Sequence, residues 1–187
     1  MKIKSNRIKW LNVGRKLFAE EGISAINIVR LSKVVGTSKS SFYFLFKTRE
    51  NYLIELIEHW GTESTDRIIE EIEIMKNPVK QFKKLMVLAY TDYENNKFLM
   101  HLRVYATQNE FASKLLNKIE KRRLKISSDV LEHLGFSKEE SKKKAYDIYY
   151  YYLGFFEFHK NKKITTKKII STIDELFNLL HISEVIN

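Results

Sequence analysis

Residues 27–46 predict two short helices joined by a tight corner, and no other segment constrains the fold as strongly. Asn27 can cap the first helix by accepting a hydrogen bond from a free N–H group of the first turn. Gly36 ends this helix, because glycine readily adopts the left-handed conformation that often follows a helix. Ser38 can cap the second helix. A short corner with glycine between two helices is typical of the helix-turn-helix motif.

The two helices have an apolar side and a polar side. In the first helix, three apolar residues recur at helical spacing and predict a buried face: Ile28, Leu31 and Val35. The buried side of the second helix is formed by Phe42, Leu45 and Phe46. This helix opens with Lys39, Ser40 and Ser41, at the end that enters the major groove of DNA in such motifs. The segment therefore predicts a DNA-reading helix.

The segment Gly36–Glu50 resembles the recognition segment of the TetR family of bacterial transcriptional regulators. The usual form in that family is Gly-Val-Ser-x-x-x-(apolar)-Tyr-x-His-Phe, followed by a short step to a basic residue and a glutamate. Leu17–Gly22 matches the family's first helix and its closing glycine, so the resemblance covers roughly residues 8–55. Three residues depart from the family's usual form. Thr37 stands where valine is commoner, Leu45 where histidine or tyrosine is commoner, and Ser32 where alanine is usual.

The resemblance implies which residues contact DNA. In the family, the residues matching Asn27, Tyr43 and Arg49 contact backbone phosphates, and the positions matching Lys39, Ser40, Ser41 and Phe44 face bases. The side chains suit these roles, since a lysine can donate to guanine O6 or N7 and a phenylalanine can contact a thymine methyl group. For Tyr43 the alternative is a half-buried ring with a solvated hydroxyl. The complete predicted DNA-binding set is Asn27, Thr37, Ser38, Lys39, Ser40, Ser41, Tyr43, Phe44, Lys47 and Arg49.

The net charge of +10 is concentrated near the start of the chain. Residues 1–50 contain eleven Lys or Arg side chains against three Glu, whereas residues 51–187 contain twenty-two basic and twenty acidic side chains. Cations close to a duplex release condensed counterions, so phosphate binding predicts this asymmetry. A basic surface kept for solubility is the alternative. Four early cations either contact DNA or are solvated: Lys2, Lys4, Arg7 and Lys9.

The composition predicts an all-α protein of about nine helices. The chain has one proline, six glycines and no cysteine among 187 residues, and it is rich in Leu, Ile, Lys and Glu. A three-helix, homeodomain-like head is followed by a long helix capped by Thr48 and interrupted at Gly61. Asn77 is expected to cap the next helix, and Asn95 and Asn96 are expected to separate two later helices. Ser137 and Glu140 are expected to form a capping box at the start of another helix. The remaining helices are expected near residues 78–93, 97–107, 110–133, 138–156 and 166–180.

The resemblance implies two domains. Residues 1–50 form the DNA-binding domain, and residues 51–187 form a larger domain for ligand binding and dimerisation. A pocket for a small apolar or amphipathic ligand needs mostly apolar walls with a few polar groups. The residues with this character are Trp60, Tyr90, Tyr93, His101, Arg103, Tyr105, Gln108, Tyr149 and Tyr152. Core packing explains each of them equally well.

The helix near residues 138–156 is apolar nearly all round, which predicts cover on more than one side. With the amphipathic helix that follows, it suggests a homodimer through a four-helix bundle, the arrangement that the TetR resemblance also implies. The expected contacts are Ile148, Tyr152, Phe155, Phe156, Ile173, Leu176, Phe177 and Leu180. The alternative is a helix that is central within its own domain. The basic middle of helix 110–133 is interpreted as a solvated face, with a second DNA contact as the alternative.

Nothing in the sequence favours an enzyme, a metal site or a cofactor. The five histidines never lie three or four residues apart, and no glycine-rich phosphate loop occurs. The start of the chain lacks the apolar core of a signal peptide, and a cytoplasmic location is expected. The predicted function is a ligand-responsive transcriptional regulator, more a repressor than an activator, that binds a palindromic operator as a homodimer. The alternative is an interaction module or enzyme that keeps a helix-turn-helix-like head.

Overall fold

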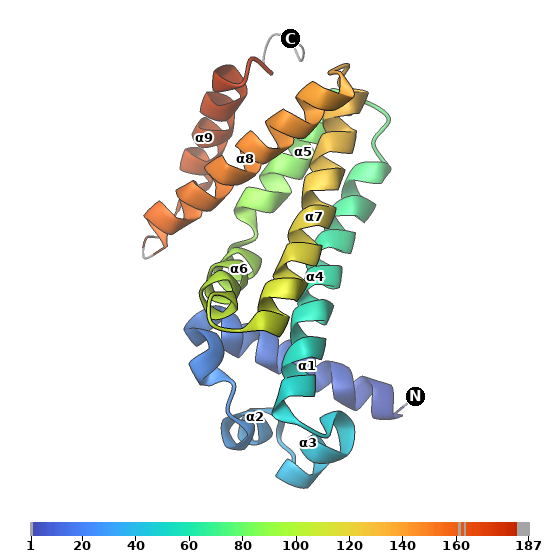
Figure 1. The fold of residues 1–187 in the computed structure, drawn as a ribbon, viewed down its shortest axis with the longest axis vertical. Coiled ribbons are helices and arrows are strands. Elements are labelled where there is room, and N and C mark those ends of the chain that lie inside the picture. Colours follow the sequence, from blue (N-terminus) through green and yellow to red (C-terminus); the bar gives the residue numbers. More distant parts are fainter. Residues whose placement is uncertain (1, 161, 163, 183–187) are drawn as a thin grey trace. The chain divides into compact units, whose positions relative to one another are not determined.

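The computed structural model describes residues 2–160, 162 and 164–182, and every regular element in these residues is a helix (Figure 1). The elements are α1 (Lys2–Glu21), the 3-10 turn η1 (Gly22–Ala25), α2 (Ile28–Val35), α3 (Lys39–Phe46), α4 (Arg49–Glu73), α5 (Pro78–Thr91), α6 (Tyr93–Ala106), α7 (Glu110–His133), α8 (Lys138–His159) and α9 (Thr166–Leu179). The predicted all-α fold is confirmed. Among the described helices, none combines the length and the apolar character needed to cross a membrane.

Several helices begin at the capping residues that the sequence predicts. Asn27 Oδ1 accepts from Val29 N at 2.9 Å, and Asn77 Oδ1 accepts from Lys80 N at 3.0 Å. Ser137 and Glu140 form the predicted capping box, with the Glu140 carboxylate accepting from Ser137 N at 3.0 Å. A cap of this kind stabilises a helix by about 1 kcal/mol. Local hydrogen bonds therefore set most helix starts.

Two predicted helix breaks are wrong. Gly61 is buried inside α4, which continues to Glu73. Glycine costs about 1 kcal/mol in a helix, and packing of the completely buried neighbour Trp60 offsets this cost. Asn95 and Asn96 lie in the first turn of α6 rather than between helices, because α5 and α6 are separated by Asp92 alone.

The chain divides into two compact units. The first comprises residues 1–64 and 94–118, and the second comprises residues 65–93 and 119–187. Both α4 and α7 run from one unit into the other. The predicted boundary between the DNA-binding domain and the ligand-binding domain, at residue 50, falls inside the first unit. This division by function stays a prediction.

An aromatic cluster forms the core around α1, α3 and the start of α4. The ring of Phe42 lies 5.3 Å from Trp10 and 5.2 Å from Tyr52, measured between centroids. The Tyr52 hydroxyl donates to the carbonyl oxygen of Trp10 at 2.9 Å, and burial raises the pKa of this phenol. A Cβ atom on Gly14 would lie 1.8 Å from the same hydroxyl. The close approach of α1 and α4 therefore requires glycine at position 14.

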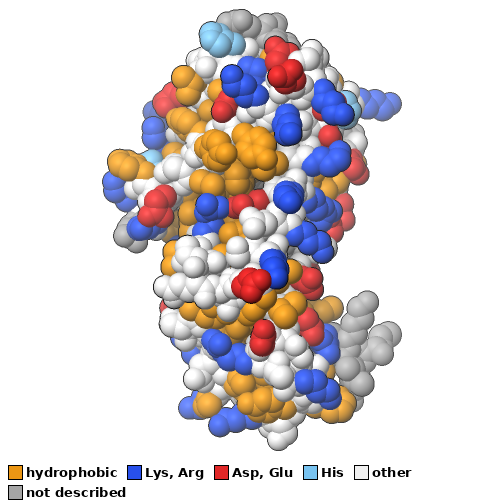
Figure 2. Space-filling model, in the orientation of Figure 1, with side chains coloured by type: hydrophobic (Ala, Val, Ile, Leu, Met, Phe, Trp, Pro, Cys, Tyr) orange, Lys and Arg blue, Asp and Glu red, His pale blue; other side chains and the backbone are white. Residues whose placement is uncertain are grey.

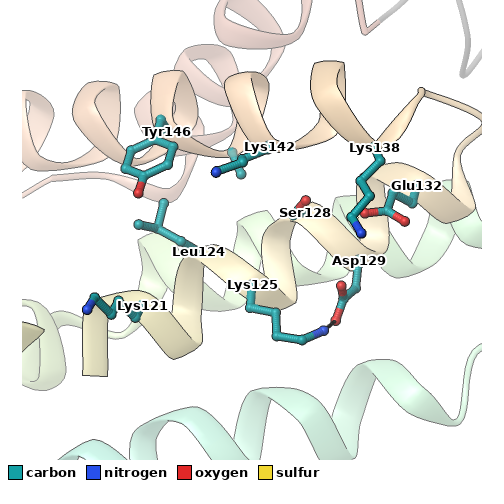
Figure 3. Close-up of a pocket in the computed structure, with 10 residues that line it drawn as sticks. Lys121, Leu124, Lys125, Ser128, Asp129, Glu132, Lys138, Lys142 and Tyr146 are labelled. Carbon is teal, nitrogen blue, oxygen red and sulfur yellow. Dashed lines mark hydrogen bonds and ion pairs between the residues drawn. The ribbon is translucent and has the colours of Figure 1, made fainter. Parts of the chain in front are cut away.

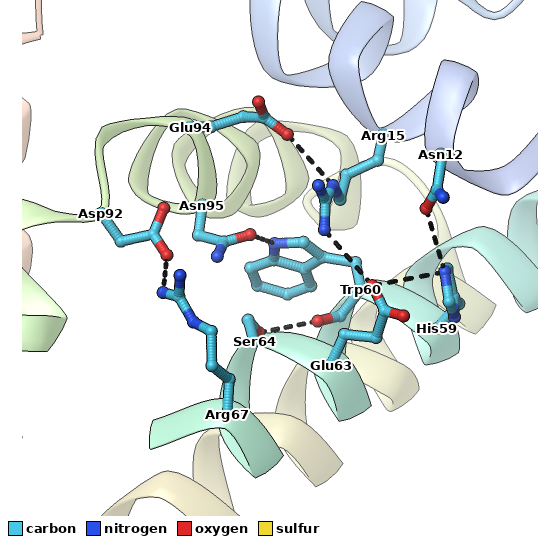
Figure 4. Close-up of polar contacts among 10 residues, drawn as sticks. All are labelled: Asn12, Arg15, His59, Trp60, Glu63, Ser64, Arg67, Asp92, Glu94 and Asn95. Carbon is cyan, nitrogen blue, oxygen red and sulfur yellow. Dashed lines mark hydrogen bonds and ion pairs between the residues drawn. The ribbon is translucent and has the colours of Figure 1, made fainter. Parts of the chain in front are cut away.

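Helix α6 packs against α1 and α4 within the first unit. The ring of Phe98 lies 4.4 Å from Phe18 and 4.5 Å from Trp60, with the Trp60 ring stacked. Figure 4 shows the polar contacts beside this stack: Trp60 Nε1 donates to Asn95 Oδ1 at 2.9 Å. Arg15 of α1 pairs with Glu63 of α4 at 3.3 Å and with Glu94 of α6 at 3.0 Å. These contacts hold three helices together.

In the second unit, α5, α8 and α9 share one core. The rings of Phe82 and Phe177 stack with centroids 5.0 Å apart. Tyr90 of α5 lies 5.3 Å from Tyr152 and 5.7 Å from Phe156 of α8. The inner side of α8 is thus covered within the chain itself.

Candidate nucleic-acid interface

The corner between α2 and α3 has the geometry of a helix-turn-helix. Gly36 ends α2 in the left-handed conformation, with φ of 75° and ψ of 41°. Ser38 then caps α3 by accepting from Ser41 N at 3.2 Å. The corner contains only Gly36, Thr37 and Ser38. The motif predicted from the sequence is therefore present in the structure.

The two sides of α3 differ as predicted. Phe42, Leu45 and Phe46 are buried. Lys39, Ser40, Tyr43 and Phe44 are exposed, and Phe44 leaves 65% of its surface open. Figure 2 shows basic and hydrophobic side chains side by side on the surface of the region that contains α2 and α3. A phenylalanine held outward on a basic helix is available to a partner that offers both apolar and anionic groups.

Lys47 connects α3 to α4 through a strained turn. Its φ is 64° and its ψ is −51°, and the N–H of Thr48 donates to the carbonyl of Phe46 at 2.7 Å. This is the rare γ-turn with positive φ, a conformation that residues with a Cβ atom seldom adopt. The Lys47 ammonium lies 5.5 Å from the centroid of the exposed Phe44 ring. The strained turn thus places a cation beside the outer side of α3.

Arg49 bonds the segment that precedes α2. Its Nε donates to the carbonyl of Ile26 at 2.9 Å, and its Nη2 donates to the carbonyl of Ile23 at 3.4 Å. Arg49 is the first residue of α4, so these bonds tie α4 to the start of the helix-turn-helix. The sequence assigned Arg49 only to a phosphate. Its partners, more than twenty residues earlier, could not be foreseen from local spacing.

Arg7 positions α3 from the side of α1. It pairs with Glu55, donates to the carbonyl of Leu45 and lies over the Phe46 ring at 4.9 Å. The sequence grouped Arg7 with the early cations that are either solvated or in contact with DNA. Its contacts show a packing role, which no local signal indicated. Of this group, the side chains of Lys2 and Lys4 lie outside the described residues.

The predicted ligand residues fall in both compact units. Trp60, His101, Arg103, Tyr105 and Gln108 belong to the first unit, and Tyr90, Tyr93, Tyr149 and Tyr152 belong to the second. Trp60 is part of the core described above. The His101 ring packs against the end of α1, where a Cβ atom on Gly22 would lie 2.9 Å from Nδ1. Burial is the main cause that lowers the pKa of His101.

Three of the tyrosines lie together. The ring centroid of Tyr152 is 5.3 Å from that of Tyr90 and 5.9 Å from that of Tyr149. Tyr149 donates to Glu120 Oε1 at 3.0 Å. Burial raises the pKa of Tyr152 to about 12. This tyrosine cluster, defined as Tyr90, Tyr149 and Tyr152, combines aromatic faces with an adjacent carboxylate.

Most of the residues expected at a dimer contact are covered within the chain. Leu180 is half-buried, and the other seven are buried: Ile148, Tyr152, Phe155, Phe156, Ile173, Leu176 and Phe177. The packing of Tyr152, Phe155 and Phe156 against Tyr90 of α5 explains much of the apolar character of α8. The exposed apolar residues of α8 are different ones, namely Tyr146, Tyr150 and Phe158.

Within the described residues, no group of three or more His, Cys, Asp or Glu side chains is arranged to hold a metal ion.

Comparisons with known proteins agree with this fold. No family model matches the chain. An 84-residue stretch is 31% identical to the HTH-type transcriptional regulator YerO of Bacillus subtilis, and it covers 44% of this chain and 29% of that protein's length.

Solved structures match over nearly the whole chain. A TetR-family regulator from Agrobacterium tumefaciens has a TM-score of 0.80 at 14% identity, covering 94% of this chain and 98% of its own. A TetR-family regulator from Cytophaga hutchinsonii has a TM-score of 0.78 at 14% identity, covering 97% and 96%. A candidate transcriptional regulator from Saccharomonospora viridis, solved with choline, has a TM-score of 0.82 at 15% identity, covering 95% and 96%. The chain has the fold of the TetR-family transcriptional regulators.

Proposed function

We propose that this protein is a transcriptional regulator of the TetR type that reads a palindromic operator as a homodimer. The observation that carries the proposal is the outer side of α3, where Lys39, Ser40 and Phe44 are exposed on a helix held by a buried core. The stretch shared with YerO and the fold of the TetR regulators support it. The protein acts by binding DNA and not by catalysis, and its location is the cytoplasm that the sequence predicts.

Base recognition is assigned to the start of α3. A lysine donates to guanine in the major groove, and the methyl group of thymine suits the Phe44 ring. Ser40 and Ser41 add hydroxyl groups that can donate or accept. A good contact to a base edge contributes about 1–3 kcal/mol of discrimination. Four residues are therefore enough for a half-site of a few base pairs.

Phosphate contacts are assigned to the rim of the same surface. The Tyr43 hydroxyl and the Lys47 ammonium flank the bases that α3 reaches, and Asn27, Thr37 and Ser38 present polar groups at the starts of α2 and α3. Arg49 reaches a phosphate only while it also holds the carbonyls of Ile26 and Ile23. Neutralised phosphates make the affinity fall steeply with salt concentration.

The homodimer is assigned to the exposed side of α8 rather than to its buried side. Tyr146 and Tyr150 lie one turn apart with ring centroids 5.9 Å apart, and Gly154 follows one turn later. Nothing lies within 4 Å of a Cβ atom built on Gly154, so this stretch has room for a facing helix. A twofold axis through such a surface produces a self-complementary contact. Two copies of α3 would then match the two halves of a palindrome.

The ligand is assigned to the second unit, around the tyrosine cluster. A small apolar or amphipathic molecule suits its aromatic faces. The related structure from Saccharomonospora viridis contains choline, and aromatic faces attract quaternary ammonium groups. A choline-like cation is therefore the first ligand to test, and release of DNA on binding would make the protein a repressor.

The test is selection of bound sequences from a random duplex pool by the purified protein at near-physiological salt. A palindromic consensus is the expected result, and it supports both specific recognition and a twofold protein. Binding that is sensitive to salt but has no sequence preference would refute the proposal. The alternative, an interaction module or enzyme with a helix-turn-helix-like head, would then apply.

A further inference from the structure

A groove with a volume of about 470 Å³ lies between α7 and α8 in the second unit. Figure 3 shows that its two walls face each other, with Leu124 and Ser128 on α7 opposite Lys142 and Tyr146 on α8. The volume is within the range of about 300–1,000 Å³ that is usual for small-molecule sites. The groove is lined by neither the tyrosine cluster nor any residue of the helix-turn-helix.

Lysines dominate the lining of this groove. Lys121 and Lys125 come from α7, and Lys138 and Lys142 come from α8. Lys125 is paired with Asp129 at 2.6 Å, whereas the side chains of the other three form no ion pair or hydrogen bond with any described residue. Like charges gathered in a hollow raise the local potential and attract anions. Three of the four ammonium groups are thus available to a ligand.

The charges are unevenly distributed along the groove. Its two carboxylates, Asp129 and Glu132, lie toward the end that holds Lys138 (Figure 3). Toward the other end, Lys142 and the ring of Tyr146 project from α8 toward Leu124 of α7 (Figure 3). This end combines an ammonium group and a hydroxyl group with apolar surface from Leu124 and the buried Ala145. An anionic head group is favoured here, away from the carboxylates.

We propose that the groove binds a small organic anion, with a carboxylate or phosphate group near Lys142, at the end of the groove where Lys121 also lies (Figure 3), and an apolar body against Leu124 and Tyr146. A charge-assisted hydrogen bond is roughly twice as strong as a neutral one. The apolar floor of the groove, formed by Leu124, Ala145 and the Tyr146 ring, favours binding because an apolar ligand body there removes apolar surface from water. Duplex DNA does not fit this description, because a long polyanion would also meet Asp129 and Glu132. The site is additional to the DNA-binding and ligand-binding surfaces proposed above, and it shares Tyr146 with the dimer contact proposed on α8.

Titration calorimetry with simple probes tests this site on the full chain. The probes are phenyl phosphate and phenylacetate, with inorganic phosphate as the head group alone and benzyl alcohol as the neutral body alone. Both aromatic anions are expected to bind, and the tighter of the two identifies the preferred head group. Equal affinity for benzyl alcohol and the aromatic anions would overturn the role of the lysines, and binding of inorganic phosphate as tightly as phenyl phosphate would overturn the role of the apolar floor.

A pair of matched variants locates the binding. Lys121→Gln/Lys142→Gln removes two charges from the groove, and Lys118→Gln/Lys143→Gln removes two exposed charges from α7 and α8 outside it. We expect the first variant to weaken phenyl phosphate binding at least about tenfold, since each lost charge-assisted hydrogen bond is a strong one, and the second to leave it nearly unchanged. Equal effects in the two variants would refute the site. Unchanged helical content by circular dichroism shows that the first variant is folded.

Lysine acetylation with mass-spectrometric detection gives an independent measurement. Phenyl phosphate should protect Lys121 and Lys142 from acetylation and leave Lys143 reactive. Protection of none of the groove lysines would overturn the proposal. So would a loss of duplex DNA affinity in Lys121→Gln/Lys142→Gln as large as that in Lys39→Ala, because the lysines would then serve DNA.

Discussion

At the scale of single residues, two positions have unusual local geometry: Gly14, which lies against the Tyr52 hydroxyl, and Lys47, which forms the strained turn between α3 and α4. Gly14 leaves room for the Tyr52 hydroxyl, which donates to the Trp10 carbonyl. Lys47 adopts a conformation that glycine would tolerate without strain. A substitution at either position has a defined structural consequence, and each leads to a prediction.

Gly14→Ala should destabilise the protein by about 1–3 kcal/mol, because the added methyl group overlaps the Tyr52 hydroxyl and forces α1 and α4 apart. Urea unfolding followed by circular dichroism measures the free energy of unfolding. Tyr52→Phe alone loses one hydrogen bond and should cost about 1 kcal/mol. The double variant should be more stable than the sum of the two effects predicts, because the overlap is relieved. Simple additivity would contradict the proposed clash.

Lys47→Gly should increase the free energy of unfolding by about 1 kcal/mol, since glycine adopts positive φ without penalty. The same change should weaken DNA binding, because a cation next to α3 is lost. Lys47→Gln is the control, as it removes the charge but keeps the strain: DNA affinity should fall similarly, with no gain in stability. A destabilised Lys47→Gly variant would show that the turn is not strained.

At the scale of elements, α3 has a buried side that fixes it and an exposed outer side that we propose contacts DNA. Lys39→Ala should relax the preference for particular bases, since we propose that Lys39 contacts a base edge. Tyr43→Phe should weaken binding to all duplexes about equally, since we propose that the Tyr43 hydroxyl contacts a phosphate. Selection from a random pool and titrations with fixed duplexes measure the two effects. An unchanged consensus in Lys39→Ala would refute the assignment of α3.

Arg49→Ala differs from these variants because Arg49 also supports the protein itself. It should weaken binding to all duplexes and also lower the free energy of unfolding by about 1–3 kcal/mol, since the carbonyls of Ile26 and Ile23 lose a charged donor. Thermal unfolding measured beside DNA titrations separates the two effects. Wild-type stability in this variant would leave the phosphate as the main partner of Arg49.

At the scale of the whole molecule, the proposed dimer depends on the exposed side of α8. Tyr150→Asp should shift the protein from dimer to monomer, because a charge would be buried in the contact. Sedimentation at several concentrations measures the change. Val104→Asp is a suitable control, as Val104 is equally exposed but lies on α6 of the other unit. A dimer that persists in Tyr150→Asp would move the contact away from this side of α8.

Features that depend on neighbouring residues could be predicted from the sequence. The caps at Asn27, Ser38 and Asn77 and the left-handed Gly36 involve bonds within about four residues, so residue type and spacing were sufficient. The buried side of α3 followed from helical periodicity for the same reason. The continuous α4 was missed because a packing contribution outweighs the local cost of Gly61.

The sequence by itself determined most helix starts and the helix-turn-helix, because these depend on hydrogen bonds and periodicity within one or two turns. Only the tertiary structure decided which side chains remain available to partners. Arg7 and Arg49 bond residues 48 and 23 positions away, and the buried rings of α8 pack against Tyr90 of α5. Contacts between distant segments leave no local pattern in the sequence, and folding alone establishes them.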